Sequence, residues 1–314
     1  MSPESNVLSR RQVLAGAAAA GALSLMPKLE SSPRKRALRI AHLTDIHVQP
    51  ERKADQGMGE CLKIVNELSD KPDVIFTGGD LIMDSFNADP DRTKVQWELF
   101  TKNFRENNRL PVEHCIGNHD LWMGKGKTDD NDRRLGKQWA CDILDLEKPY
   151  RSFDRAGWHF IFLDSTFPEG TGYKGRLDDA QFEWLAGDLA STPKTTPVMV
   201  VSHIPILSAS AYFDGDNEKT GNWVVPGAWM HLDARKIKDL FAKHPNVKLC
   251  ISGHIHLVDR VDYNGVTYFC NGAVCGGWWN GNYHECAPGY ALVDLYDDGT
   301  FENRYVEWGW QPKP

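Results

Sequence analysis

Five short apolar runs recur along the chain after residue 36, and a small turn follows each of them. The runs are rich in Val and Ile and do not alternate with polar residues, which is typical of strands buried on both faces of a sheet. Helical patterns of about 10–15 residues lie between them. The strands are expected at 38–43, 74–76, 112–116, 198–201 and 247–251, and the helices at 57–68, 93–107, 132–144, 178–190 and 233–243.

The last part of the chain has a different pattern. From residue 258 onward, short strand-like segments are joined by tight turns at Asn264-Gly265 and Asp297-Asp298-Gly299. Asn-Gly and Asp-Gly pairs are strong hairpin signals. Strand–helix alternation followed by hairpins predicts an α/β fold in which antiparallel strands are added to parallel ones, giving two packed sheets. The added strands are expected at 258–263, 266–270, 291–296 and 301–306.

Length and composition are those of one globular domain with an unusual N-terminus. The chain has 314 residues, of which 41% are hydrophobic and 25% charged, so disorder of its main part is excluded. Residues 37–314 are expected to form a single domain. They carry 30 Lys and Arg against 41 Asp and Glu, which argues against a broad nucleic-acid-binding surface. A phosphate substrate stays compatible with this charge, because bound cations would invert the local field.

The N-terminus has the features of an export signal. Ser9-Arg10-Arg11-Gln12-Val13-Leu14 resembles a twin-arginine motif, with Val13 at a position that usually holds Phe. The apolar run at 13–26 is too short to span a bilayer comfortably. Residues 1–36 are therefore predicted to be a twin-arginine-type signal peptide and linker, and the protein to be exported by the twin-arginine machinery to the periplasm or beyond. The alternative is a disordered or anchoring N-terminal helix.

Seven cysteines are present, without C-x-x-C spacing, which argues against a structural zinc site. Cys115 and Cys250 lie inside apolar runs and are expected to be buried thiols. Cys270, Cys275 and Cys286 are close together in the sequence, and two of them could form one disulfide.

Residues able to bind metal ions follow each of the five apolar runs. In open α/β sheets, ligands bind beyond the carboxyl ends of the strands, so these residues are expected to converge. His, Asp and Asn together suit Mn²⁺, Fe or Zn²⁺, and a carboxylate is able to bridge two cations. The candidate ligands are Asp45, His47, Asp80, Asn118, His203, His254 and His256.

Each candidate ligand also has an ordinary structural interpretation. Asp45 and His47 alone could be a turn and a surface histidine, and Asn118 alone is typical of a turn. His203 alone could be a structural histidine at a strand end. Their joint position after five strands favours a metal site.

The ordered motifs D-x-H, G-D, G-N-H-D, H and G-H-x-H resemble those of the calcineurin-like metallophosphoesterase superfamily over about residues 37–310. The resemblance implies a four-layer α-β-β-α sandwich of two mixed β-sheets flanked by helices, with a dimetal site at the carboxyl ends of the strands. It implies that Asp80 bridges two divalent metal ions. It further implies that Asp45, His47 and His256 hold the first ion, and Asn118, His203 and His254 the second.

The resemblance also implies a reaction. A water or hydroxide between the two cations would attack phosphorus, because the cations lower its pKa. His119 would contact the phosphate and protonate the leaving oxygen, with Asp120 orienting its ring. The expected function is hydrolysis of a phosphate monoester or diester. The order and spacing are most similar to smaller bacterial members that resemble cyclic-nucleotide phosphodiesterases, so a nucleotide-like small molecule is an expected substrate.

Two aromatic segments are expected to govern substrate choice. Residues 208–232 form a long irregular stretch, and 276–283 form a glycine-rich one; long irregular loops in compact domains are commonly functional. Their rings could stack on a base or sugar, or could instead cover the core. Trp122 could line the entrance, and His231 and His284 could reach the site. The aromatic residues are Tyr212, Phe213, Trp223 and Trp229 in the first segment and Trp278, Trp279 and Tyr283 in the second.

Two other functions remain open at this point. A phosphoprotein (Ser/Thr) phosphatase would present a shallow groove, whereas an enzyme for small molecules would enclose a pocket between the two aromatic segments. A non-catalytic metal-binding scaffold would typically have lost ligands, and none is missing here.

Overall fold

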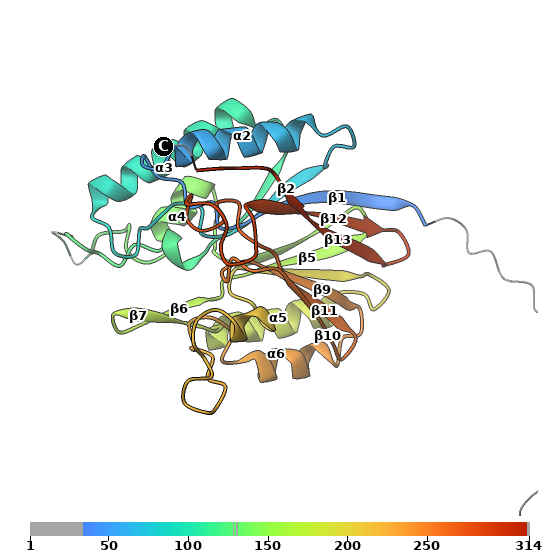
Figure 1. The fold of residues 1–314 in the computed structure, drawn as a ribbon. Coiled ribbons are helices and arrows are strands. Elements are labelled where there is room, and N and C mark those ends of the chain that lie inside the picture. Colours follow the sequence, from blue (N-terminus) through green and yellow to red (C-terminus); the bar gives the residue numbers. More distant parts are fainter. Residues whose placement is uncertain (1–33, 128, 130, 313–314) are drawn as a thin grey trace, which may run out of the picture. The chain divides into compact units, whose positions relative to one another are not determined.

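The computed structural model describes residues 34–127, 129 and 131–312 (Figure 1). The predicted signal peptide lies outside these residues, except for the last three residues of its linker. Across the described ranges, no helix combines the length and apolar character needed to cross a membrane.

The first sheet has five strands in the order β13-β12-β1-β2-β3. Strands β1, β2 and β3 are parallel, whereas β12 and β13 are antiparallel additions at one edge. The last two strands confirm the expected hairpin around Asp298-Gly299. The bounds are β1 (Arg36–Leu43), β2 (Val74–Gly78), β3 (Val112–Cys115), β12 (Gly289–Tyr296) and β13 (Phe301–Glu307).

The second sheet has six strands in the order β10-β11-β9-β8-β5-β4. Its four central strands are parallel, and both edge strands are antiparallel. A separate hairpin, β6 (Thr166–Glu169) and β7 (Gly172–Gly175), lies beside it. The sheet consists of β4 (Arg151–Arg155), β5 (Trp158–Leu163), β8 (Val198–Ser202), β9 (Val247–Ser252), β10 (Asp259–Tyr263) and β11 (Val266–Cys270).

The helices cover the outer faces of the two sheets (Figure 1). The first sheet is covered by α2 (Ala54–Glu67), α3 (Pro90–Asn107) and α4 (Gln138–Leu144), and the second by α5 (Asp179–Ser191) and α6 (Ala234–Phe241). Two helix starts follow from the sequence. Asp89 caps α3 by accepting a hydrogen bond from the Arg92 amide, with Pro90 at the first helical position, and Asp178 caps α5 in the same way.

Three apolar cores separate the four layers. Phe76 of the first sheet packs edge-on against Phe160 and Phe162 of the second, in the core between the sheets. Leu62 and Trp97 belong to the core between the first sheet and its helices. The third core joins the second sheet to α5 and α6. The four-layer α-β-β-α sandwich of two mixed sheets is therefore confirmed.

The structure differs from the sequence prediction in two places. The helix predicted at 132–144 begins only at Gln138, because Gly136 has a φ of +68° and interrupts helical geometry. The strands β4 to β7 were not predicted. Strand β5 is a buried apolar run that pairs in parallel with β8, but no candidate metal ligand follows it.

All seven cysteines are free thiols in the structure. Cys115 and Cys250 are buried, as expected from their positions in apolar runs, and burial raises the pKa of both thiols. No disulfide forms among the three late cysteines.

Candidate metal centre and active site

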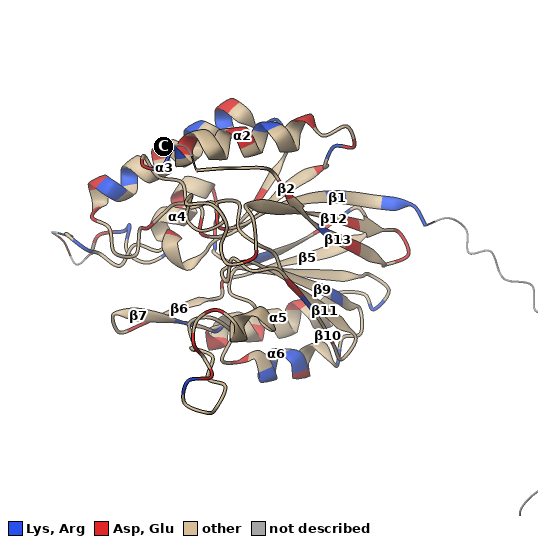
Figure 2. Cartoon of the chain, viewed as in Figure 1, with Lys and Arg blue, Asp and Glu red and all other residues tan. Residues whose placement is uncertain are grey.

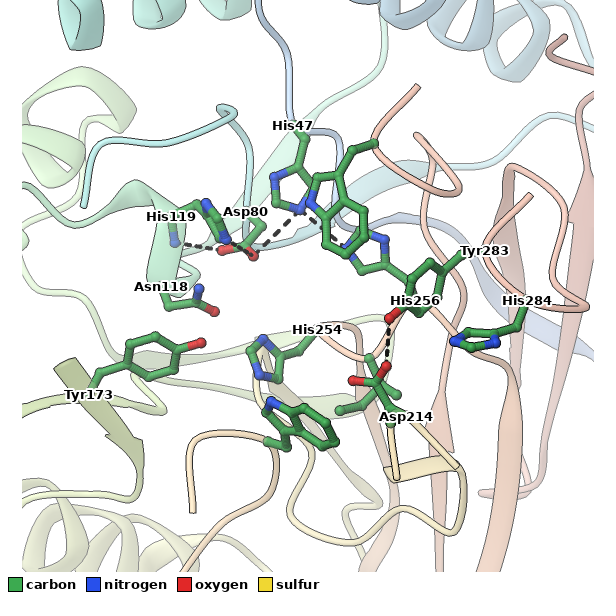
Figure 3. A pocket seen from close by; sticks show the side chains of 14 residues that line it. His47, Asp80, Asn118, His119, Tyr173, Asp214, His254, His256, Tyr283 and His284 are labelled. Carbon is green, nitrogen blue, oxygen red and sulfur yellow. Dashed lines mark hydrogen bonds and ion pairs between the residues drawn. The ribbon is translucent and has the colours of Figure 1, made fainter. Parts of the chain in front are cut away.

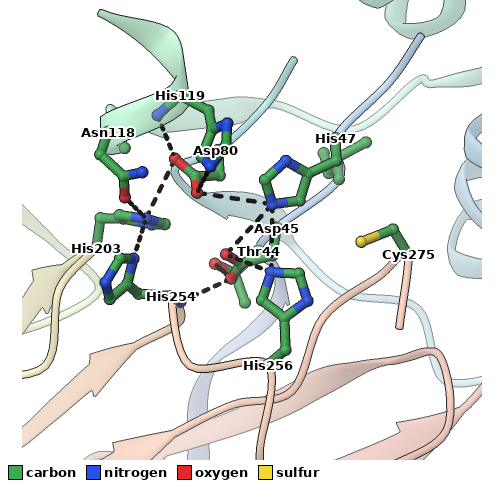
Figure 4. A network of polar contacts seen from close by, with 12 residues as sticks. Thr44, Asp45, His47, Asp80, Asn118, His119, His203, His254, His256 and Cys275 are labelled. Carbon is green, nitrogen blue, oxygen red and sulfur yellow. Dashed lines mark hydrogen bonds and ion pairs between the residues drawn. The ribbon is translucent and has the colours of Figure 1, made fainter. Parts of the chain in front are cut away.

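The loops that follow five parallel strands meet at the carboxyl ends of these strands, where their side chains form one cluster (Figure 4). Strands β1, β2 and β3 of the first sheet position four of the candidate ligands. Strands β8 and β9 of the second sheet position the other three. Both sheets therefore contribute to one cluster, as the pattern of strand ends predicted.

The backbone at this edge is strained. Five of the seven candidate ligands have positive φ angles between 47° and 73°, in the left-handed region that non-glycine residues rarely adopt. Each such residue costs about 1–3 kcal/mol and persists only where its surroundings hold it. Here the Asp45 amide donates to the Gly79 carbonyl and the His47 amide to the Asp80 carbonyl, both at 3.0 Å. The five are Asp45, His47, Asp80, His254 and His256.

One group of ligand atoms surrounds Asp45. The Nε2 atoms of His47 and His256 lie 3.2 Å apart, and His256 Nε2 lies 3.3 Å from Asp45 Oδ1. His47 Nε2 also lies 3.6 Å from Asp80 Oδ2. Around a cation with bonds of about 2.1 Å, neighbouring ligand atoms lie roughly 3.0–3.4 Å apart. This group therefore has nearly the spacing of a metal's coordination shell.

The second group surrounds His203. His203 Nε2 lies 3.1 Å from Asn118 Oδ1 and 3.2 Å from both His254 Nδ1 and Asp80 Oδ1. Asp80 thus turns one carboxylate oxygen toward each group, which is the geometry that a bridging ligand requires. The structure brings all seven predicted residues together; their binding of metal stays a prediction.

Three histidines have their outer nitrogen fixed by a main-chain carbonyl. Because a carbonyl only accepts hydrogen bonds, these nitrogens carry the protons, and the opposite nitrogens present lone pairs to the centre of the site. This is the arrangement usually found for metal-binding histidines. The bonds join His203 Nδ1 to Gly78 O at 2.8 Å, His256 Nδ1 to Gly276 O at 2.6 Å, and His254 Nε2 to Ala228 O at 2.9 Å.

Asp45 has one satisfied oxygen and one unsatisfied oxygen. Its Oδ2 accepts hydrogen bonds from Thr44 Oγ1 at 2.6 Å and from the His254 amide at 2.9 Å. Its Oδ1 is buried without a donor and faces His256 Nε2. A buried anionic oxygen that faces an imidazole nitrogen is unfavourable unless a cation or a proton lies between them, and despite burial the Asp45 carboxylate accordingly raises the pKa of His256. Gly253 permits this approach, because a Cβ there would overlap Asp45 Oδ2 and Thr44.

Burial and neighbouring charges shift the histidine pKa values in opposite directions. Burial disfavours protonation of His203, but the Asp80 and Asp45 carboxylates outweigh it and raise its pKa to about 9. Burial, together with the charge of His203, lowers the pKa of His254 to about 3. Cation binding requires neutral imidazole, so a cation must displace the proton of His203, and its affinity falls as the pH is lowered.

His119 is positioned as expected, but Asp120 is not. The His119 ring is partly exposed and lines the cavity, with Nε2 3.9 Å from Asp80 Oδ2 (Figure 3). The Asp120 carboxylate is fully buried and accepts hydrogen bonds from the amides of Gly117 and Leu81, both at 2.8 Å. The prediction that Asp120 orients the His119 ring is therefore wrong, since its oxygens bind backbone instead. The carboxylate that faces His119 Nδ1, at 3.9 Å, is Asp84.

A cavity of about 430 Å³ lies directly over the two groups of ligand atoms (Figure 3). Trp229 from the first aromatic segment and Trp278 and Tyr283 from the second line it, which confirms that both segments reach the site. Tyr173 of β7 and Asp214 also line it, and no motif signalled either residue.

Other aromatic residues of these segments have different positions. Trp122 is fully buried and its indole donates to the Ala88 carbonyl, so the prediction that it lines the entrance is wrong. Trp279 is also buried, and its indole donates to the carbonyls of Ile46 and His47. It supports the ligand loop and does not contact the cavity. Three further residues are exposed outside the cavity: Tyr212, Phe213 and Trp223.

Of the two other histidines that were expected to reach the site, only His284 does so. His284 lines the cavity. His231 is buried, with Nδ1 2.9 Å from Asp233 Oδ1 and Nε2 3.2 Å from Ser202 Oγ, and does not reach the cavity.

Known proteins with similar sequences are phosphoesterases. The chain is 26% identical to a 3',5'-cyclic-nucleotide phosphodiesterase of Nostoc sp. over 287 residues, which cover 86% of this chain and 92% of that relative. It is 29% identical over 199 residues to the human serine/threonine-protein phosphatase CPPED1, covering 63% of this chain and 57% of that protein.

The fold is similar to that of a dimetal phosphatase from Danio rerio, with a TM-score of 0.58 and 13% identity over 88% of this chain and 100% of that one. The family model described as calcineurin-like phosphoesterase matches residues 38–258, which is more than half of the chain. With the two-sheet sandwich and the converging ligand atoms already described, these matches show that the chain belongs to the calcineurin-like phosphoesterase family.

Proposed function

We propose that this protein is a dinuclear metal-dependent phosphodiesterase that acts on a small-molecule phosphate ester. The observation that supports this most strongly is the cavity directly over the ligand atoms, with aromatic rings from three separate segments in its walls. Small-molecule sites are typically concave and aromatic, with a few polar groups that fix orientation.

Each group of ligand atoms has a role in this proposal. Asp45, His47 and His256 would hold one cation, and Asp80 would bind both cations through its two oxygens. Two divalent ions of Mn, Fe or Zn would supply a nucleophilic water near neutral pH and neutralise the phosphoryl oxygens. The set for the other cation is Asn118, His203 and His254.

His119 supplies the proton in this proposal. Its Nε2 lies on the cavity side near Asp80, where a phosphoryl group bound over the two cation positions would lie within reach. The imidazole would donate a proton to the leaving oxygen as the phosphorus–oxygen bond breaks. Asp84 faces the other nitrogen and would hold the ring in its donating orientation.

The choice between a diester and a phosphoprotein substrate rests on access. The Nostoc relative is named a cyclic-nucleotide phosphodiesterase, whereas the human relative is named a protein phosphatase and matches less of the chain. A phosphorylated side chain on a folded protein needs an open groove. Here Tyr173, Trp229 and Trp278 stand around the ligand atoms, an arrangement that suits a small molecule.

We also propose that the enzyme works outside the cytoplasm. The support is the sequence of residues 1–36, with Arg10-Arg11 before an apolar run. Twin-arginine export carries folded proteins, which suits an enzyme that acquires its cations before export.

A hydrolysis screen tests the proposal. Purified protein is treated with a chelator, reloaded with Mn²⁺, Fe²⁺, Zn²⁺ or Mg²⁺, and assayed on nitrophenyl monoesters and diesters, cyclic nucleotides and phosphopeptides. We expect diester hydrolysis that requires added metal. Hydrolysis of phosphopeptides alone would favour the phosphatase, and no hydrolysis with any metal would favour a non-catalytic scaffold.

A further inference from the structure

Asp214 is a carboxylate in the cavity wall that belongs to neither group of ligand atoms (Figure 3). Tyr283 Oη donates a hydrogen bond to Asp214 Oδ1 at 2.5 Å. Burial and this hydrogen bond raise the pKa of Tyr283 above its usual value, so the phenol stays the donor and the carboxylate the acceptor. Asp214 Oδ2 has no hydrogen bond to any described residue, which leaves it available to a ligand.

The rings next to Asp214 form a corner. Trp278 and Tyr283 have centroids 5.2 Å apart and planes at 87° to each other. A flat nucleobase is bound best between parallel rings, whereas perpendicular rings form the walls of a box around a compact group. Aromatic faces attract cations through their quadrupole, and Trp does so most strongly.

The charges of the cavity point to a cation in the ligand. Among the described residues that line the cavity, none is Lys or Arg. Two divalent ions would carry four positive charges, which Asp45, Asp80, the phosphodiester and a hydroxide nucleophile would offset together. No basic side chain of the lining is then left to balance Asp214. A positive charge on the substrate would balance Asp214 where a neutral organic group would not.

We propose that the organic group of the substrate ester carries an alkylammonium group of about the size of choline. The ammonium lies against Trp278, Tyr283 and Trp229, and Asp214 is its counter-ion. The substrate is therefore a zwitterionic phosphodiester. This inference rests on the proposed function, because the phosphate must lie over the two cation positions. The hydrolysis is unchanged: phosphorus gains a bond to the oxygen of water as its bond to the leaving oxygen breaks, and the leaving oxygen takes a proton from His119.

Two diesters of the same shape test the inference. One is p-nitrophenyl phosphocholine, and the other is p-nitrophenyl 3,3-dimethylbutyl phosphate, in which carbon replaces the ammonium nitrogen. With the Mn²⁺-loaded protein we expect kcat/KM at least about tenfold higher for the choline ester. Asp214→Asn should reduce this ratio to about two or less by lowering kcat/KM for the choline ester, because the substitution removes only the charge.

Two further variants complete the experiment. Asp216→Asn removes the same charge two residues further along the same loop, from an exposed side chain that pairs with Lys219 and does not line the cavity. Asp216→Asn should keep the full preference for the choline ester over the neutral ester. Tyr283→Phe keeps the ring but loses the hydrogen bond to Asp214, and should give an intermediate preference.

Equal kcat/KM on the two esters in the wild-type protein, or a preference that survives Asp214→Asn, would overturn the inference. Efficient hydrolysis of 3',5'-cyclic AMP together with equal rates on the two esters would overturn it while leaving the proposed function intact. Absence of hydrolysis of every ester rejects the proposed function. Calorimetry then decides the inference alone: phosphocholine should bind about tenfold more tightly than 3,3-dimethylbutyl phosphate, and only when Asp214 is present.

Discussion

Like His47, His119 has no carbonyl or carboxylate within hydrogen-bond distance of its Nδ1, but its ring is partly exposed to the cavity. Its role in the proposed reaction depends on proton donation and not on holding a cation. His119→Ala should therefore reduce kcat by about 10²–10⁴-fold while both metal ions stay bound. Steady-state kinetics and metal analysis of the same preparation measure the two effects. The control is His244→Ala, which changes a half-buried histidine beyond α6 that does not line the cavity. Loss of metal together with activity would show that His119 is a ligand instead.

Asp84 faces the outer nitrogen of that ring and should act on it indirectly. Asp84→Asn should lower kcat by about tenfold or less, with KM and metal content unchanged, because only the orientation of His119 is loosened. The double variant with His119→Ala should be no slower than His119→Ala alone. A further loss in the double variant would mean that Asp84 acts independently of His119.

At the scale of single residues, Asp120 shows what the sequence does not predict, namely the direction of a side chain. The G-N-H-D string places Asp120 next to His119 in the chain, and the family resemblance implied that Asp120 orients the His119 ring. The 3₁₀ turn at Asn118–Asp120 instead directs the carboxylate inward, where it binds the amides of Gly117 and Leu81. Sequence spacing identifies which residues belong to a motif, but the direction of each side chain depends on local backbone geometry.

At the scale of elements, α2 packs against the loop that carries the second aromatic segment. Gly57 leaves room for the Trp279 ring, because a Cβ at this position would overlap it. Gly57→Ala should lower the free energy of unfolding by about 1–3 kcal/mol, since the buried ring has little space to move. Denaturant unfolding measures the change.

Gly187 in α5 provides the matched comparison. It is also a helical glycine, but no described atom apart from its two chain neighbours and the backbone of its own helix lies within 4 Å of the position of an added Cβ. Gly187→Ala should raise the free energy of unfolding by about 0.5–1 kcal/mol, because alanine favours the helix. Equal effects of the two substitutions would show that the contact between Gly57 and Trp279 is unimportant.

His159 connects three elements through its two ring nitrogens. It lies on β5, with Nδ1 2.7 Å from Asp154 Oδ1 on β4 and Nε2 2.8 Å from Asp188 Oδ2 on α5. The hydrogen bonds to Asp188 and Asp154 outweigh burial and raise the pKa of His159 above 6.5. Its contribution to stability is therefore fully present below about pH 6.5 and is lost as the pH rises through the raised pKa of the folded state.

His159→Gln should remove that pH dependence. The free energy of unfolding of the wild-type protein, relative to that of the variant, should fall as the pH rises above 6.5. Chemical denaturation of metal-free protein at several pH values measures the difference, so that cation binding does not contribute. A difference that is constant with pH would contradict the ion pairs seen here.

Whether a strand could be predicted from the sequence depended on the residues that follow it. The five strands that lead to candidate ligands, and the later hairpins, were predicted from apolar runs and turn residues. Strand β5 has an equally apolar sequence, but the residue that follows it is Asp164, which pairs with Lys137 and takes no part in the cluster. The hairpin of β6 and β7 is short and only partly buried, so its sequence carries no strong periodicity. Tyr173 therefore could not be assigned to the site in advance.

At the scale of the whole molecule, the cations would join the two sheets. Ligands from β1, β2 and β3 meet ligands from β8 and β9, so removing the cations leaves the buried carboxylates balanced only by protonated imidazoles such as that of His203. Chelation should lower the melting temperature, and added Mn²⁺ or Zn²⁺ should restore it. The effect should weaken below about pH 6, because protons then compete for the imidazoles.

Asp80→Asn combined with His203→Ala is the control for that experiment. The double variant lacks the shared carboxylate and a central imidazole, so its melting temperature should not respond to chelator or added metal. A response as large as that of the wild-type protein would place the stabilising cations elsewhere.

The left-handed backbone at five ligand positions has a consequence for how such a protein would evolve. Glycine adopts these φ angles readily, so a glycine in place of Asp45 or His254 would relieve local strain and make the metal-free fold easier to form. Selection for folding alone would therefore favour glycine at these positions, and the site would be lost. A chain that keeps carboxylates and imidazoles at all five positions holds them against that tendency, which is expected of a lineage in which turnover, and not the fold alone, is under selection.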